Sequence, residues 1–118
     1  MYKTTKKQFE LFKLECNKGI KVFDLGGWNI TFYHEKMRSD AWAECKACLD
    51  GRQMNLRLNI EPNQPITPDI IRKVALHECI HGVLARFSEL AHSRCVTGAE
   101  LFEAEEELVI KLIKVLVR

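Results

Sequence analysis

The chain opens with a segment in which apolar residues recur at helical spacing. Over residues 5–18, Phe9, Phe12 and Cys16 stand three or four positions apart among lysines and glutamates. This spacing places side chains on one face of an α-helix, and Gly19 follows it as a stop signal. The pattern predicts an N-terminal helix over residues 5–18.

The next segments have the composition of strands and are separated by turn residues. The runs IKVFDL and WNITFYHE flank Gly26 and Gly27, and the runs AWAECKACL and RQMNLRLNI flank Asp50 and Gly51. β-Branched and aromatic runs on either side of Gly-Gly or Asp-Gly are typical of tight hairpins. We therefore predict two hairpins that form a small, mostly antiparallel sheet.

The second hairpin has a predictable register. A two-residue turn at Asp50 and Gly51 pairs Cys45 with Leu56, and alternation along the strand assigns each side chain to a face. The residues predicted to face the core are Met54, Leu56, Leu58 and Ile60, and those predicted to face away are Asn55, Arg57 and Asn59. Because residues three apart point to opposite faces, Cys45 should look inward and Cys48 outward. This CxxC spacing therefore predicts neither a zinc knuckle nor a redox pair.

A second helix begins at a clear cap. Thr67 supplies a capping hydroxyl, Pro68 suits the first helical position, and Asp69 lies near the positive end of the helix dipole. We predict a helix from about Pro68 to about Leu90.

This helix carries the sequence His77-Glu78-Cys79-Ile80-His81, an HExxH motif. Residues four apart lie on one helical face, so both imidazoles can reach one metal ion, while Glu78 projects about 100° around the helix toward a water on that ion. The spacing is that of a zinc hydrolase. The alternative is a pair of core histidines with Glu78 as their buried hydrogen-bond partner.

Such a zinc site needs a third protein ligand. We predict a last helix from Gly98 to the C-terminus, in which Glu105 falls near the centre of the apolar arc and Glu106 at its edge. The arc consists of Leu101, Phe102, Leu108, Val109, Leu112, Ile113 and Leu116. A carboxylate in a core-facing stripe requires a cation, which makes Glu105 the predicted third ligand. The alternatives are Glu106, His92 folding back, or a merely solvated helix start.

Composition and charge indicate which broad class of protein to expect. The chain has 118 residues, 47% of them hydrophobic, and a formal net charge of +2. This predicts one domain over residues 1–118, with no charge pattern that favours nucleic acid or a membrane surface. The start MYKTTKKQFE lacks the apolar core of a signal peptide, and five scattered cysteines fit reduced thiols. We expect a soluble, cytoplasmic protein.

The motif HECIH and the late helix EAEEELVIKLI resemble those of small zincin-type metallopeptidase-like proteins of phages and prophages, distant relatives of the ImmA/IrrE and gluzincin peptidases. The resemblance covers residues 20–118. It implies a minimal zincin-like core in which His77, His81 and Glu105 hold zinc and Glu78 is the general base. The expected fold class is α+β, with an N-terminal helix, the sheet, and the HExxH and C-terminal helices packed on one of its faces.

The expected function is zinc-dependent peptide-bond hydrolysis, with a peptide or protein substrate lying along the strand of residues 52–60. The alternative is a zincin-fold binding or structural protein, with or without zinc, that hydrolyses nothing. Candidate oxyanion stabilisers are Tyr33, His34, His92 and Arg94.

Overall fold

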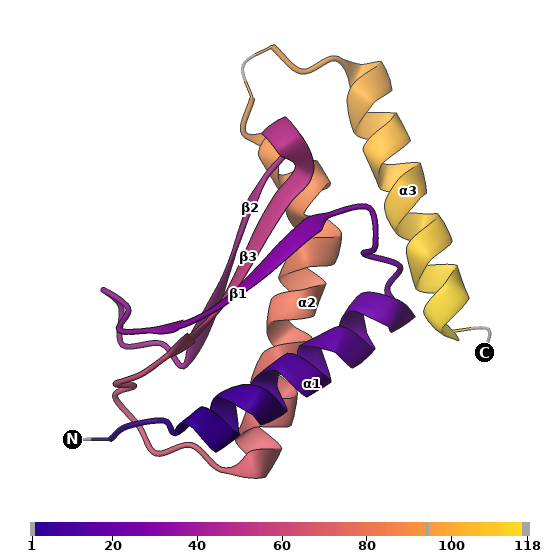
Figure 1. Cartoon of the computed structure of the whole chain (residues 1–118). Coiled ribbons are helices and arrows are strands. Elements are labelled where there is room, and N and C mark those ends of the chain that lie inside the picture. Colours follow the sequence, from indigo (N-terminus) through magenta and orange to yellow (C-terminus); the bar gives the residue numbers. More distant parts are fainter. Residues whose placement is uncertain (1, 94, 117–118) are drawn as a thin grey trace.

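The computed structural model describes residues 2–93 and 95–116, which form an α+β arrangement, as predicted (Figure 1). In chain order the elements are α1 (Lys6–Val22), β1 (Asn29–Glu35), β2 (Ala43–Cys48), the 3₁₀ turn η1 (Asp50–Arg52), β3 (Gln53–Asn59), α2 (Pro68–Ala91) and α3 (Gly98–Leu116). Within the described part of the chain, no helix is both long and apolar enough to cross a bilayer.

Helix α1 begins at a reciprocal cap and is longer than predicted. Gln8 N–H donates to Thr5 Oγ1 at 3.1 Å, and Thr5 N–H donates to Gln8 Oε1 at 2.8 Å. The helix passes through Gly19 and ends at Val22. A Cβ at position 19 would lie 2.7 Å from Cys79 Sγ, so this glycine allows α1 to approach α2 rather than stopping the helix.

The predicted hairpin around Gly26 and Gly27 is wrong. Residues 20–22 belong to α1, and β1 pairs with β3 in parallel instead of with a preceding strand. The sheet order is β1-β3-β2, so it is a three-stranded mixed sheet rather than two hairpins. Phe23 and Leu25 lie in the turn after α1, and both are buried in the core. Alternating buried residues of this kind are also typical of a strand, which explains the wrong prediction.

The hairpin between β2 and β3 is confirmed with its register. Cys45 lies opposite Leu56, and Ala43 opposite Leu58. The turn passes through Gly51, whose φ of +73° favours glycine. Met54, Leu56 and Leu58 are fully buried, as predicted.

Asn59, predicted to face solvent, is fully buried at the end of β3. Its Nδ2 donates to the carbonyl oxygens of Ser39 and Ala41, and its Oδ1 accepts from the N–H groups of Met37 and Glu61. These bonds fix the connection between β1 and β2, so a polar side chain can be buried here without an unsatisfied group.

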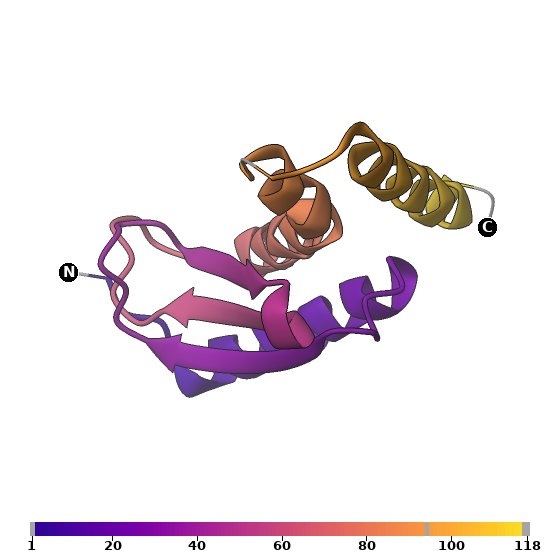
Figure 2. The same ribbon diagram turned by 90° about the horizontal axis from the view of Figure 1, so that it is seen from above.

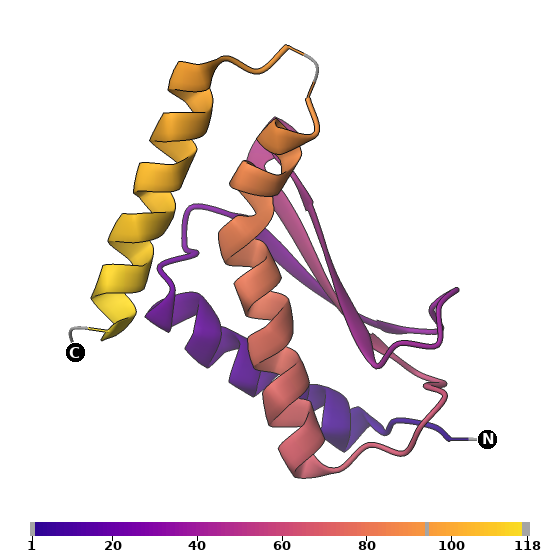
Figure 3. The same cartoon turned by 180° about the vertical axis from the view of Figure 1, so that it is seen from behind.

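Helix α2 is the centre of the molecule. It packs against α1, β2 and α3, and Figure 3 shows it between α3 on one side and the sheet on the other, with the side toward the viewer uncovered by the other elements. The fully buried side chains lie between this helix, α1 and the sheet: Phe12, Cys16, Leu25, Met54, Leu56, Leu58, Ile71, Ala75 and Cys79. The two histidines of the HExxH motif on this helix are exposed.

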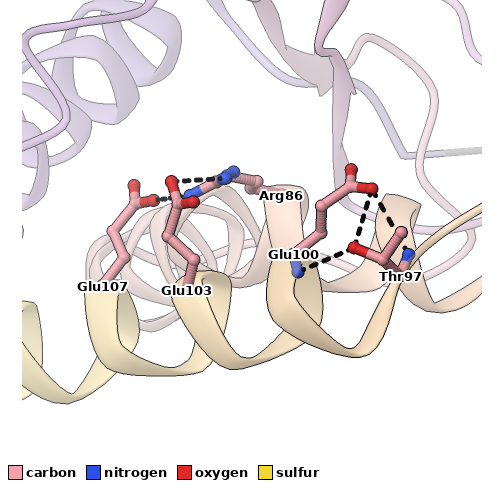
Figure 4. A network of polar contacts seen from close by, with 5 residues as sticks. All are labelled: Arg86, Thr97, Glu100, Glu103 and Glu107. Carbon is pink, nitrogen blue, oxygen red and sulfur yellow. Dashed lines mark hydrogen bonds and ion pairs between the residues drawn. The ribbon is translucent and has the colours of Figure 1, made fainter.

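Helix α3 packs on α2 and lies apart from the sheet (Figure 2), rather than joining α2 on one face of the sheet as predicted. Its first turn is capped at Thr97, whose Oγ1 accepts from Glu100 N–H at 3.1 Å. Arg86 of α2 reaches Glu107 at 2.5 Å and Glu103 at 3.1 Å (Figure 4). Of its described side chains only that of Ala104 is buried, Leu108 and Val115 pack partly against the core, and Lys114 pairs with Asp24, so α3 docks through a small apolar contact together with several ion pairs.

Candidate metal site

His77 and His81 lie side by side on α2, as the motif predicts. Thr67 caps this helix by accepting from Ile70 N–H at 3.3 Å, and the helix then continues to Ala91. One turn apart on the regular helix, the two imidazoles place their Nε2 atoms 3.1 Å from each other. Both side chains are exposed.

Glu78 lies on the inner side of the same turn and is only 6% exposed. No described residue forms a hydrogen bond or ion pair with its carboxylate. Burial raises its pKa above the ordinary value, the His77 imidazole opposes that rise, and the Glu44 carboxylate adds to it. Its carboxylate oxygens keep some contact with solvent, and a largely buried carboxylate with no protein partner is a feature of sites that need a base.

His77, Glu78 and His81 together form a group that could hold a metal ion. Their potential ligand atoms all lie within 4.8 Å of one another. Two nitrogens bound at about 2.0–2.1 Å to a tetrahedral zinc ion would be about 3.3 Å apart, close to the separation of the two Nε2 atoms. The donor set therefore fits two of the ligands that zinc prefers. The alternative of two core histidines bonded to Glu78 is not what the structure contains, because the imidazoles are exposed and Glu78 accepts no bond from them.

Two cavities adjoin this group. One of about 480 Å³ borders His77 and Glu78 and is lined also by Trp42, Lys73 and Gln64. The other, of about 510 Å³, borders His81 and extends past Cys45 to His92. Lys73 precedes His77 by four residues, so the spacing that revealed the histidine pair also places Lys73 on their face of the helix, although our sequence analysis missed it.

Strand β2 forms the edge of the sheet next to the histidines. Asn59 N–H donates to Trp42 O at 2.8 Å, and the alternation of an antiparallel ladder then directs the N–H and C=O groups of Ala43, Cys45 and Ala47 away from β3. The predicted substrate strand, residues 52–60, is wrong as a docking edge, because β3 is central and paired on both sides. The edge strands are β1 and β2, and β2 is the one next to the histidines.

The structure does not bring Glu105 or Glu106 to the histidines. Both are exposed on α3, and neither belongs to the group of potential ligands found among the described residues. Arg86, which faces α3, follows His81 by five residues and is therefore about 140° away around α2. The histidines thus point away from the helix of their own chain that carries the predicted third ligand.

His92 is too far away to share an ion with His81. It is the C-cap of α2, eleven residues later, which corresponds to about 16 Å along the axis. Its Nδ1 lies 2.7 Å from Ser88 O, a contact that orients the ring at the helix end. Although His92 lines the cavity that borders His81, the alternative in which it folds back onto the metal is wrong.

The other candidate oxyanion stabilisers have structural contacts elsewhere. His34 Nε2 lies 2.7 Å from Thr4 Oγ1, its ring stacks on Phe9, and burial lowers its pKa. Tyr33 packs under the Arg57 guanidinium. Arg94 lies outside the described residues. Neither His34 nor Tyr33 lines the cavities beside the histidines.

The cysteines have the orientations that the register predicts. Cys45 is half-buried and Cys48 is exposed, and neither belongs to the metal-ligand group found in the described part of the chain. Cys79, inside the motif, is buried, and its thiol donates to Cys16 O at 3.5 Å. A small side chain is required there because α1 crosses α2 at Gly19.

No protein-family model, curated protein or solved structure matches this chain.

Proposed function

We propose that this protein is a zinc-dependent peptidase in which His77 and His81 hold the zinc ion and Glu78 is the general base. The observation that carries the proposal is the position of Glu78. Its side chain is largely buried, its carboxylate borders the cavity beside His77 and has no partner among the described residues, and it lies within 4.8 Å of two imidazole nitrogens that have the separation expected for zinc ligands.

The chemistry divides between the ion and the chain. When bound, zinc lowers the pKa of a coordinated water and polarises the carbonyl that it contacts. Glu78, whose pKa is raised by burial, is a stronger base than an exposed glutamate. It takes one proton from the attacking water and delivers it to the leaving amine, so that the C–N bond breaks and a carboxylate and an amine are released.

The free edge of β2 is the proposed binding site for the substrate backbone. An extended peptide can form hydrogen bonds with the outward N–H and C=O groups of Ala43, Cys45 and Ala47 as an added strand. A side chain of that peptide would enter the cavity of about 480 Å³ beside His77, where Trp42 offers an apolar surface and Lys73 a charge.

The second candidate is a zincin-fold metal-binding protein that hydrolyses nothing. It is favoured by the exposure of both histidines on an open side of α2, since catalytic zinc normally works in a site shielded from bulk water. The two candidates differ in the role of Glu78, which the binding protein does not require.

Metal analysis and a peptide-cleavage assay distinguish these functions. Protein purified without chelator should contain zinc and cleave members of a quenched fluorescent peptide library. Glu78→Gln should keep the zinc and lose the cleavage, whereas Glu10→Gln, an exposed control on α1, should keep both. Zinc without cleavage in the parent protein supports the binding protein, and absence of zinc contradicts both candidates.

A further inference from the structure

Helix α3 presents an apolar stripe to solvent. Five of the six exposed large apolar residues described on it lie within one arc of the helix, away from the ion pairs to Arg86: Phe102, Val109, Leu112, Ile113 and Leu116. The sixth, Ile110, lines a cavity together with Arg86. Phe102 is 63% exposed and Leu116 is 82% exposed. The stripe is contiguous, and such patches mark surfaces that another molecule covers.

Helix α2 has a second exposed apolar face, next to the metal site. Leu76, Ile80 and Leu84 follow one another at intervals of four residues and are between 42% and 49% exposed. His77 and His81 are the residues that immediately follow Leu76 and Ile80, so they lie along one border of this face. Whatever covers the apolar face of α2 also approaches the histidines.

The charges of the two faces are complementary. Glu105 lies within the α3 stripe, between Phe102 and Val109, and the described residues give it no ion pair. Glu103 and Glu107, in contrast, are both bound to Arg86. On α2, Lys73 also lacks an ion pair among the described residues, and it borders the face that carries the histidines. One face therefore offers a carboxylate, and the other a lysine and a metal-binding pair.

These faces cannot meet within one chain in this fold. The α3 helix of the same chain lies on the Arg86 side of α2, about 140° around the helix from His81. A second copy has no such restriction. A twofold arrangement would let each copy provide its α3 stripe and receive that of the other on its α2 face, so that both faces are buried in both copies.

We propose that two copies of this chain associate through these faces and that Glu105 of one copy is the third ligand to the zinc ion held by His77 and His81 of the other. The proposal rests on the zinc-dependent function proposed above. It gives each ion three protein ligands and one open position, which is the composition of catalytic zinc sites. Once the stripe is covered, the zinc ion also supplies the cation that the desolvated Glu105 carboxylate would then need.

The first test measures the mass of the protein by analytical ultracentrifugation with zinc and with EDTA. The parent protein should be a dimer with zinc and should shift toward monomer with EDTA. Glu105→Gln should remove the zinc-dependent shift and weaken zinc binding, while Glu106→Gln, a neighbour that lines the cavity beside Arg86 of its own chain, should keep zinc. Val109→Arg, a change at an exposed position that the monomer tolerates, should prevent the dimer and weaken zinc binding.

The second test is complementation between two defective variants. The His77→Ala, His81→Ala double variant keeps the carboxylate, and Glu105→Gln keeps the histidines. Neither alone should retain zinc through dialysis, but an equimolar mixture should recover up to one zinc ion per two chains, because each mixed dimer contains one complete site. The altered side chains are exposed, so circular dichroism should show folded chains in both cases.

Each result decides between the proposals. A parent chain that stays monomeric while binding zinc, Glu105→Gln that binds zinc as tightly as the parent, or a mixture that recovers none would overturn the shared site and leave zinc binding intact. A zinc-independent dimer that survives Glu105→Gln would overturn it as well. A parent chain that takes up no zinc would instead contradict the proposed function itself.

Discussion

Gly19 of α1 lies against Cys79 of α2 so closely that a methyl group at position 19 would sit 2.7 Å from the sulfur. Cys79 is a neighbour of both His77 and Glu78 along the motif. The crossing of the two helices therefore sets the depth at which α2 lies in the fold, and with it the side on which the histidines emerge. Both partners are small because interiors are close-packed.

Replacement of Gly19 by alanine should destabilise the protein by about 1–3 kcal/mol, the usual cost of overpacking. In a helix with free space at this position, glycine to alanine would stabilise the protein by about 1 kcal/mol. The sign of the change in unfolding free energy therefore shows whether the contact with Cys79 is present. Urea unfolding measures the difference. Gly26→Ala, where nothing lies within 4 Å, is the matched control and should have little effect. A second change, Cys79→Ala, should recover part of the loss, and a stabilising Gly19→Ala would contradict the packing.

The same contact explains which parts of the fold the sequence could predict. The cap at Thr67, the turn at Gly51 and the HExxH spacing depend on residues close together in the chain, and all three are present in the structure. The end of α1 could not be predicted, because the reason for Gly19 lies sixty residues away at Cys79. Residues 20–22 consequently resembled a strand.

The candidate metal site was likewise predicted only in part from the sequence. The helical wheel of α3 predicts that the arc around Glu105 faces the core, but in the structure Leu108 packs against the core while Phe102 and Ile113 are exposed. A wheel does not say which side of a helix faces its neighbour. The side that faces α2 is marked instead by Ala104, which is buried, and by Glu103 and Glu107, which pair with Arg86. The side that one helix turns toward another depends on contacts between residues far apart in the chain. The third ligand therefore could not be placed from periodicity alone.

Arg86→Gln should loosen α3 without disturbing the rest of the fold. The variant removes both ion pairs to Glu103 and Glu107, and since the Arg86 side chain is partly exposed we expect a loss of about 1 kcal/mol. Hydrogen exchange should show faster exchange of amides in α3 and unchanged exchange in α1. Arg72→Gln, which removes ion pairs at the other end of α2, is the control and should leave α3 as protected as in the parent protein.

Glu78→Gln should stabilise the metal-free protein at neutral pH. Burial raises the pKa of this carboxyl in the folded chain. The folded state then binds the proton more tightly than the unfolded state, so stability falls as pH rises from about 4.3 through the raised pKa. Glutamine carries no titratable proton, so the variant does not lose this stability as the pH rises.

Thermal melts of protein stripped with EDTA should therefore show a higher Tm for Glu78→Gln at pH 7, with the gain disappearing near pH 4. Glu10→Gln serves as the exposed control. An advantage of Glu78→Gln that is constant with pH would mean that the carboxyl is not responsible for it.

Thiol labelling should separate the cysteines by burial. Cys48 and Cys95 are exposed and should react rapidly with a maleimide in the native protein. Cys45 should react slowly, because burial raises its pKa to about 12 and leaves little thiolate. Cys16 and Cys79 should react only on unfolding. Peptide mapping by mass spectrometry identifies the labelled positions, and rapid labelling of Cys45 would contradict the register of β2 and β3.

Proline substitutions along β2 should reveal whether its free edge binds the substrate. The N–H of Ala47 points away from β3, so Ala47→Pro removes an outward donor while the ladder to β3 stays intact, a position at which edge strands accept proline. The N–H of Lys46 points toward β3, so Lys46→Pro removes a ladder bond and should cost about 1–3 kcal/mol of stability. If an extended peptide adds to β2, Ala47→Pro should raise KM for peptide cleavage at nearly unchanged Tm and zinc content. Lys46→Pro, in contrast, should lower Tm. Unchanged KM in a folded, zinc-loaded Ala47→Pro protein would mean that the peptide does not follow this edge.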